Sequence, residues 1–85
     1  MRKLLYLLKS AAADSETLLP PRPDPEQEVT VILIQDGVAR RHVPAGRVYA
    51  LSDDVAARGI APAFPTISYP DLVRMLFEAD SVVAI

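Results

Sequence analysis

Apolar residues gather in five short runs along the chain, and the clearest runs are continuous rather than alternating with polar positions. The three clearest cover residues 4–8, 29–34 and 48–51, the end of the chain at 81–85 is a fourth, and 66–69 is a short fifth. A strand that is covered on both faces has a continuous apolar sequence, which is typical of parallel sheets. The pattern therefore predicts a parallel sheet of four to five strands.

A short helix is predicted directly after the third run. Ser52 supplies a candidate cap, and Asp53 and Asp54 place acidic side chains in the first turn, where the helix dipole favours negative charge. Gly59 is the expected stop, because glycine adopts the left-handed conformation that ends many helices. The predicted helix is barely two turns long.

A longer helix is predicted after the short fifth run, beginning near Ser68. Pro70 fits there because proline is tolerated in the first helical turn. The apolar positions that follow predict one buried face at spacings i, i+1, i+4 and i+5. These positions are Leu72, Val73, Leu76 and Phe77, with Met75 as a filler of the core.

The alternation of strands and short helices predicts one small α/β domain over residues 1–85, a three-layer-like fold with crossover helices packed on the sheet. Residues 11–19 are compatible with a further helix. Residues 20–28 hold four of the eight prolines and no aliphatic residue, so they predict an exposed, stiff connector.

Composition adds expectations about partners and compartment. A chain of 85 residues without cysteine buries roughly two-thirds of its unfolded surface and has no disulfide to stabilise it, so we expect a homo-oligomer or a complex. The formal charge of −2 argues against unaided nucleic-acid binding. The apolar runs are far shorter than the ~20 residues of a membrane span, and Lys9 interrupts the first run too early for a signal peptide, so we expect a cytoplasmic protein.

The candidate site lies where the strands end, because ligands of parallel sheets bind at the carboxyl edge. Each candidate also has a local explanation: Gly37 would supply a positive φ in a turn, and Asp53 would cap a helix. Together they predict a polar frame around an apolar patch, as in subunit contacts. The candidates are Lys9, Ser10, Gln35, Asp36, Gly37, Tyr49 and Asp53.

No cofactor, metal site or catalytic residue is predicted. The sequence contains neither G-x-G-x-x-G nor G-x-x-x-x-G-K-[ST], the loops that cradle nucleotide phosphates. His42 is the single histidine and lacks a second nitrogen or sulfur ligand for a transition metal. Arg40 and Arg41 precede it and Arg47 lies nearby, and we expect this basic stretch to be solvated charge, with an acidic partner or a phosphate as the alternative.

Four stretches, in order, resemble the DsrH/TusB-like family of the DsrE/F/H superfamily of sulfur-relay proteins. They are Lys9-Ser10 after the first strand, V-I-L-I-Q-D-G-V at 31–38, V-Y-A-L-S-D-D-V-A-A-R-G at 48–59 and I-S-Y-P-D-L-V-R at 67–74. The third, read as V-Y-A-L-x-x-D-x-x-A-R-G, is the most specific. The resemblance covers nearly the whole chain outside the proline-rich connector.

The resemblance implies a small α/β subunit that assembles with itself or with DsrE-like and DsrF-like cysteine-bearing relatives. Those complexes pass a persulfide between cysteines, toward 2-thiolation of the wobble uridine of tRNA or during oxidation of stored sulfur. A relay needs a thiolate, and this sequence has no cysteine; the stretch where the family keeps one offers only Ser10, Ser15 and Thr17. The absence is shared with TusB-type members, which resemble non-catalytic partners.

The sequence therefore favours a non-catalytic structural subunit of a sulfur-relay complex, with tRNA thiolation as its setting. A subunit associated with sulfur oxidation is the first alternative. A second alternative is a stand-alone homo-oligomer that binds a small anion at the strand ends. An enzyme that uses Asp36 or His42 is the third.

Overall fold

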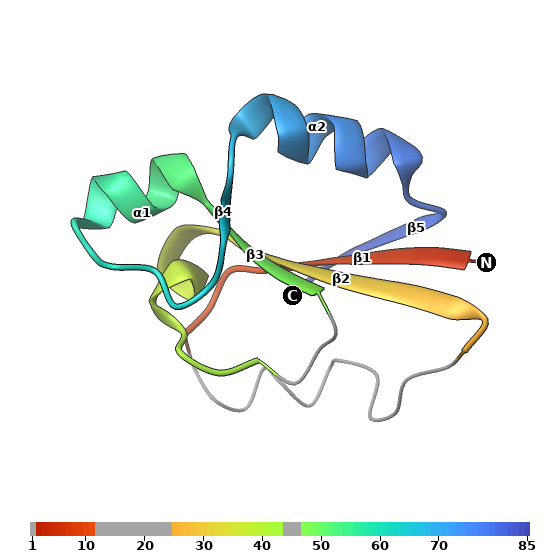
Figure 1. Ribbon diagram of the computed structural model, residues 1–85, viewed down its shortest axis with the longest axis horizontal. Helices are drawn as coiled ribbons and strands as arrows, with labels where there is room; N and C mark the ends of the chain where they lie inside the picture. Colours follow the sequence, from red (N-terminus) through yellow and green to blue (C-terminus); the bar gives the residue numbers. More distant parts are fainter. Residues whose placement is uncertain (1, 12–24, 44–46) are drawn as a thin grey trace.

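The computed structural model describes residues 2–11, 25–43 and 47–85, and these residues form a five-stranded, all-parallel sheet with two helices. The strand order is β4-β3-β2-β1-β5 (Figure 1). The predicted α/β class and the parallel sheet are confirmed. In chain order the elements are β1 (Arg2–Leu8), β2 (Gln27–Leu33), the 3-10 helix η2 (Gln35–Ala39), β3 (Arg47–Leu51), α1 (Ser52–Arg58), β4 (Thr66–Ile67), α2 (Tyr69–Glu78) and β5 (Ser81–Ala84).

The central strands are longer than their apolar runs. β1 and β2 pair in register from Arg2 with Gln27 to Leu8 with Leu33. Gln27 and Glu28 therefore belong to β2, and the prediction that they form part of the connector was wrong. Of the rest of that connector, residues 25–26 form an exposed turn, whereas 20–24 lie outside the described residues, as does nearly all of the helix-compatible stretch 11–19.

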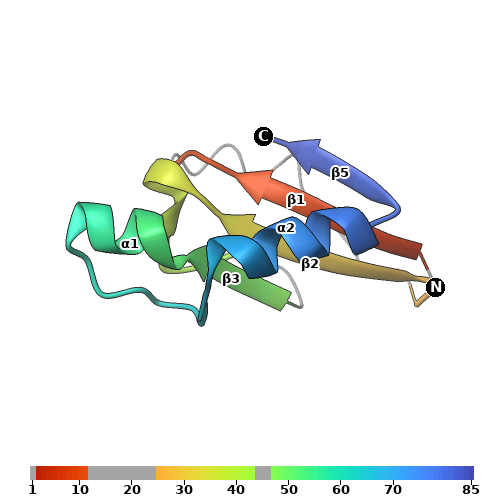
Figure 2. The same ribbon diagram turned by 90° about the horizontal axis from the view of Figure 1, so that it is seen from above.

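One face of the sheet packs against α2, which runs across β2 and β1 (Figure 2). The buried centre of this face is formed by Leu5, Ile32, Leu51 and Leu72. The cluster also includes Met75 and Leu76 of α2 and Ala79 at its C-cap, so the positions packed against the sheet are i, i+3, i+4 and i+7. Met75 is thus the core filler that the sequence predicted.

The predicted inner face of α2 was partly wrong. Leu72 is buried and Leu76 packs against the core, but Val73 is only half-buried and Phe77 is 87% exposed. The apolar residues of α2 span a wider part of the helix surface than the part that contacts the sheet, so Phe77 lies outside the contact. This leaves a large apolar ring in solvent.

The opposite face of the sheet has its own core near the carboxyl ends of the strands. Side chains from β1, β2 and β3 meet side chains from η2, α1 and the connecting loop there. The buried members are Leu8, Val31, Leu33, Val38, Val43, Ala50 and Val55. Continuous apolarity in the strands is therefore explained by burial on both faces.

The helix ends follow the sequence signals with one exception. Gly59 ends α1 in the left-handed conformation at a φ of 59°, as predicted. α2 begins beside Ser68, as predicted, and the Ser68 hydroxyl caps it by accepting a hydrogen bond from the Asp71 N–H. Ser52 does not cap α1, because β3 runs directly into the helix and the cap position is Leu51. Among the described residues, no helix is long and apolar enough to cross a membrane.

Candidate functional site

The candidate residues that follow the strands do meet at the carboxyl edge of the sheet. There η2 follows β2 and α1 follows β3, and both lie at the same end of the molecule (Figure 1). Lys9 and Ser10 follow β1 at this edge. Tyr49 lies elsewhere: it is half-buried on the face covered by α2, within the cluster around Ile32.

Gly37 joins two of the chain segments at this edge. It is buried in η2, and a Cβ at this position would overlap the Leu8 carbonyl oxygen. That oxygen already accepts a hydrogen bond from the Ile34 N–H at 3.0 Å. The prediction that Gly37 supplies a positive φ was wrong, because the positive φ belongs to Gln35, at 51°. Glycine is required at 37 for close approach rather than for a turn.

Gln35 is held in its uncommon conformation by α1. Its N–H donates to Asp54 Oδ2 at 2.7 Å, which joins the end of β2 to the first turn of the helix. A non-glycine residue in the left-handed region costs free energy and persists where its surroundings fix it. The carboxylate of Asp54 is such a fixing group.

Arg58 completes this arrangement from the last turn of α1. Its Nε lies 3.2 Å from Asp36 Oδ1, and its guanidinium lies 3.8 Å from Asp54 Oδ1. We call the five residues the rim cluster: Gln35, Asp36, Gly37, Asp54 and Arg58. Every member comes from the second or third stretch that carries the family resemblance.

The sequence pattern predicted Asp53 as a site residue, but the residue that contacts Gln35 and Arg58 in the structure is Asp54. Asp53 is exposed in the first turn of α1, whereas Asp54 is half-buried against Gln35 and Arg58. A signal for this was present, because the aspartate in V-Y-A-L-x-x-D-x-x-A-R-G is Asp54. Two adjacent acids at a helix start are indistinguishable by capping alone, so the motif spacing was the better guide.

The basic residues that follow η2 have different environments. Arg40 is 6% exposed and its Nε donates to the Ser10 carbonyl at 2.8 Å, so it fastens the chain after β1 to the chain after η2. The expectation of solvated charge was wrong for Arg40. Arg41 is exposed and donates to the Ala61 carbonyl at 2.9 Å, and His42 is an exposed loop residue.

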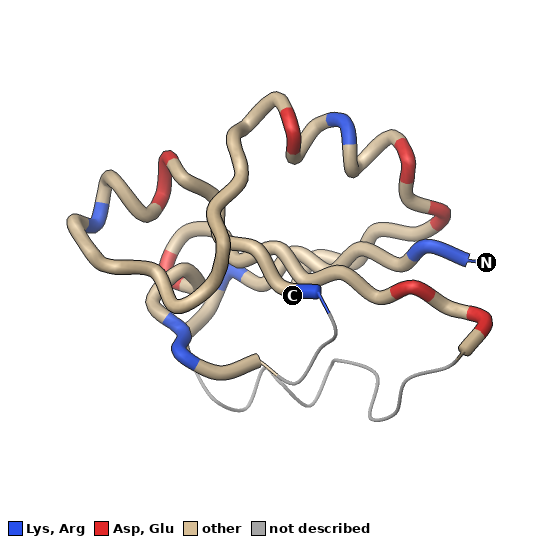
Figure 3. The backbone as a smooth tube through the Cα atoms, in the orientation of Figure 1, with Lys and Arg blue, Asp and Glu red and all other residues tan. Residues whose placement is uncertain are grey.

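Charges of both signs are interspersed around the described chain (Figure 3). At the carboxyl edge, Asp36, Asp53 and Asp54 lie among Lys9, Arg40, Arg41 and Arg58, so neither sign of charge dominates there.

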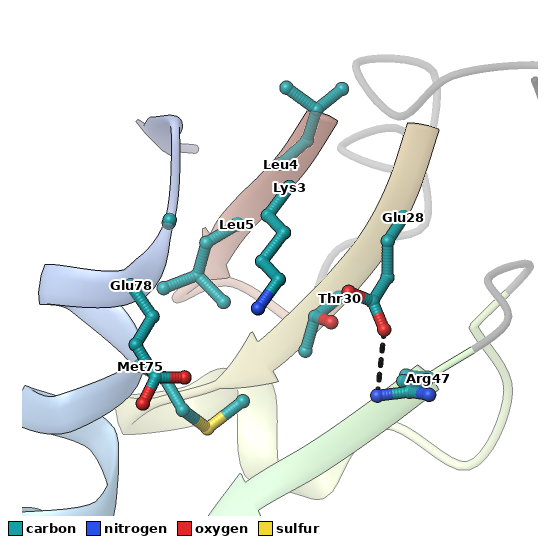
Figure 4. Close-up of a pocket in the computed structure, with 9 residues that line it drawn as sticks. Lys3, Leu4, Leu5, Glu28, Thr30, Arg47, Met75 and Glu78 are labelled. Carbon is teal, nitrogen blue, oxygen red and sulfur yellow. Dashed lines mark ion pairs between the residues drawn. The ribbon is translucent and has the colours of Figure 1, made fainter. Parts of the chain in front are cut away.

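A pocket of about 100 Å³ opens at the opposite, amino edge of the sheet, beneath the end of α2 (Figure 4). Lys3 points into it from β1, and Arg47 forms an ion pair with Glu28 at 2.8 Å (Figure 4). The complete lining is Lys3, Leu4, Leu5, Glu28, Thr30, Arg47, Met75, Glu78 and Ala79. Its two cations and two carboxylates balance, so it offers no concentrated charge to a ligand.

The described residues contain no group of three or more His, Cys, Asp or Glu side chains placed to hold a metal ion. The rim cluster is a set of fixed contacts between elements. Its Asp36 side chain is 78% exposed and is available to another molecule.

The different placement of the two adjacent acids gives a direct test. Asp54→Ala should lower the free energy of unfolding by about 1 to 2 kcal/mol, because it removes a charge-assisted hydrogen bond to a strained residue. Asp53→Ala, the matched control, should change it by no more than about 0.5 kcal/mol. Urea unfolding followed by circular dichroism measures both. Equal losses would show that Asp54 is only an ordinary first-turn acid.

No protein-family model matches this chain, and no curated protein matches it.

Proposed function

We propose that this chain is a non-catalytic structural subunit of a sulfur-relay complex that serves 2-thiolation of the tRNA wobble uridine. The observation that carries the proposal is the rim cluster. The stretches that resemble the DsrH/TusB-like family lie apart in sequence, yet their polar residues meet in space, through Gln35 with Asp54 and Asp36 with Arg58. A parallel sheet brings residues that follow neighbouring strands to one edge, and the support for the proposal is that the fixed polar contacts at this edge are made by residues of the resembling stretches.

The rigidity of the rim cluster supports a docking role. Gly37 is seated against the Leu8 carbonyl, and Gln35 is fixed by a hydrogen bond from its N–H to Asp54. A surface that is already ordered loses little conformational entropy when a partner binds. The exposed Asp36 carboxylate can then contribute a charged contact.

The chemistry of sulfur transfer assigns the persulfide to the partner. A sulfane sulfur must be accepted and released by a thiolate, and this sequence has no cysteine. Hydroxyl groups do not replace a thiolate, because they are far weaker acids and poor ligands for sulfur. The subunit therefore acts by holding a cysteine-bearing relative in place.

Two measurements on the purified chain test the proposal. After incubation with a cysteine desulfurase and cysteine, intact-mass spectrometry should show no added sulfur atom on this chain. The tagged chain should capture, from its own source, a protein whose cysteine does become persulfidated in the same reaction. A stable sulfur adduct on this chain, or capture that brings no persulfidated protein, would contradict the proposed role.

A variant pair localises the docking surface. Asp36→Ala should weaken capture of the persulfidated partner about tenfold, since charged interface contacts that are truncated cost about 1.4 kcal/mol or more. Glu78→Ala changes an exposed carboxylate beside the pocket at the amino edge of the sheet and should leave capture unchanged. Thermal melting of both variants should stay close to the wild type, because exposed ion pairs contribute little to folding. If the two variants capture equal amounts of the partner, the docking surface lies elsewhere than the rim cluster.

A further inference from the structure

The sheet face beneath α2 changes character along its strands. At the amino edge the register places Lys3 of β1 beside Glu28 of β2. Two residues further along, Thr30 of β2 lies between Leu5 of β1 and Arg47 of β3. Alternate residues of a strand share a face, and the residues that follow on this face are the apolar cluster beneath α2. A group of polar residues therefore lies at the amino edge of a face that is otherwise apolar.

Thr30 is the member of this group whose burial most needs an explanation. It is 8% exposed and lines the pocket at this edge. Its hydroxyl has no hydrogen-bond partner among the described residues. No side-chain oxygen or nitrogen of those residues is both sealed from solvent and without a partner, so the hydroxyl opens into the pocket. Burial of a hydroxyl without a partner costs free energy, and a ligand that accepts its hydrogen bond removes that cost.

Lys3 supplies a positive charge to the same pocket. Its backbone N–H donates to Asp80 Oδ2 at 2.7 Å, which holds the start of β1 against the turn between α2 and β5. Its ammonium forms no ion pair with a described residue and points into the pocket (Figure 4). A carboxylate accepts hydrogen bonds from both an ammonium and a hydroxyl. The Lys3 ammonium and the Thr30 hydroxyl therefore favour a ligand that carries a carboxylate.

The carboxylates of the pocket favour a positive group on the same ligand. Glu28 is already paired with Arg47 at 2.8 Å. Glu78 lies at the loose distance of 4.0 Å from the Arg74 Nε, so its oxygens keep the capacity to accept hydrogen bonds. A ligand with a single charge would be attracted by Lys3 or Glu78 and repelled by the other, whereas a zwitterion is attracted by both. The balanced charge of the pocket thus matches a zwitterion rather than a simple ion.

We propose that this pocket binds a free α-amino acid with a short apolar side chain. The carboxylate of the ligand accepts hydrogen bonds from the Lys3 ammonium and the Thr30 hydroxyl, and its ammonium donates to the Glu78 carboxylate. Its side chain packs against Leu5 and Met75, the apolar part of the lining. The volume of about 100 Å³ is below the roughly 300–1,000 Å³ of pockets for drug-sized ligands, so the ligand is small.

A ligand series on the wild type tests the charge requirement. Titration with L-alanine, followed by amide NMR, should shift the signals of the pocket residues and saturate with a dissociation constant of about 1 mM, within the limit for so small a ligand. Propionate keeps the carboxylate alone and alaninamide keeps the ammonium alone, and each should bind at least about tenfold more weakly. The proposal is overturned if either of them binds as tightly as alanine, or if alanine gives no saturable shift.

A pair of threonine variants tests the role of the hydroxyl. Thr30→Val should weaken alanine binding about tenfold, yet melt no lower than the wild type, because the hydroxyl it removes has no partner in the unliganded protein. Thr66→Val, the matched control on an exposed residue of β4, should bind alanine as the wild type does. Equal affinities of the two variants for alanine would overturn the proposal. The pocket and the rim cluster lie at opposite edges of the sheet, so alanine binding and partner capture succeed or fail independently.

Discussion

Gly37→Ala is expected to destabilise the protein by about 3 kcal/mol or more, at the upper end of overpacking substitutions. The added Cβ would overlap the Leu8 carbonyl oxygen, which is backbone and already accepts a hydrogen bond from the Ile34 N–H. Relief would require β1 and η2 to separate, which would disturb the core on that face. Small domains have only about 0.05–0.15 kcal/mol of stability per residue, so a large share of the total would be lost.

Gly59→Ala is the matched control for this loss. Gly59 has a φ of 59, and no heavy atom lies within 4 Å of the position that a Cβ would take, so only backbone strain opposes the substitution. That strain costs about 1 to 2 kcal/mol. Urea unfolding of the two variants should therefore rank Gly37→Ala well below Gly59→Ala in stability. The reverse ranking would mean that η2 does not rest on β1.

The strands were predictable because burial on both faces leaves a local trace in the sequence. β2 is buried from Thr30 to Leu33, and these residues lie within the longest β-branched and aliphatic run of the chain, 29–34. The strand order was not predictable, because the five runs look alike and nothing local records that β5 lies beside β1. The order of the strands is consequently visible only in the structure.

Long-range contacts explain what was missed at the candidate site. Gly37 has a turn-like sequence context, and only its distance to the Leu8 carbonyl reveals why it must be glycine. Arg40 looked like surface charge, and its burial depends on the Ser10 carbonyl, 30 residues away in sequence. The local signals were sound for Gly59 and Ser68, whose roles depend on neighbours within a few residues.

Ile32→Ala is the second substitution with a large expected effect, a loss of about 2 to 5 kcal/mol in the free energy of unfolding. Ile32 is fully buried at the centre of β2, in register with Leu7 of β1 and Tyr49 of β3, and packs in the cluster beneath α2. The neighbouring strands β1 and β3 hold β2 in place, so the structure cannot collapse around the missing atoms. A cavity therefore remains, and its cost adds to the lost transfer free energy of the side chain.

A graded series separates cavity formation from other causes. Ile32→Val removes one methylene and should cost about 0.5–1.5 kcal/mol, so the two variants should differ clearly in urea midpoint at an unchanged slope. Val29→Ala, in the same strand but only half-buried, should cost less than Ile32→Ala. Equal losses from Val29→Ala and Ile32→Ala would contradict the cavity explanation, because only Ile32 is fully buried.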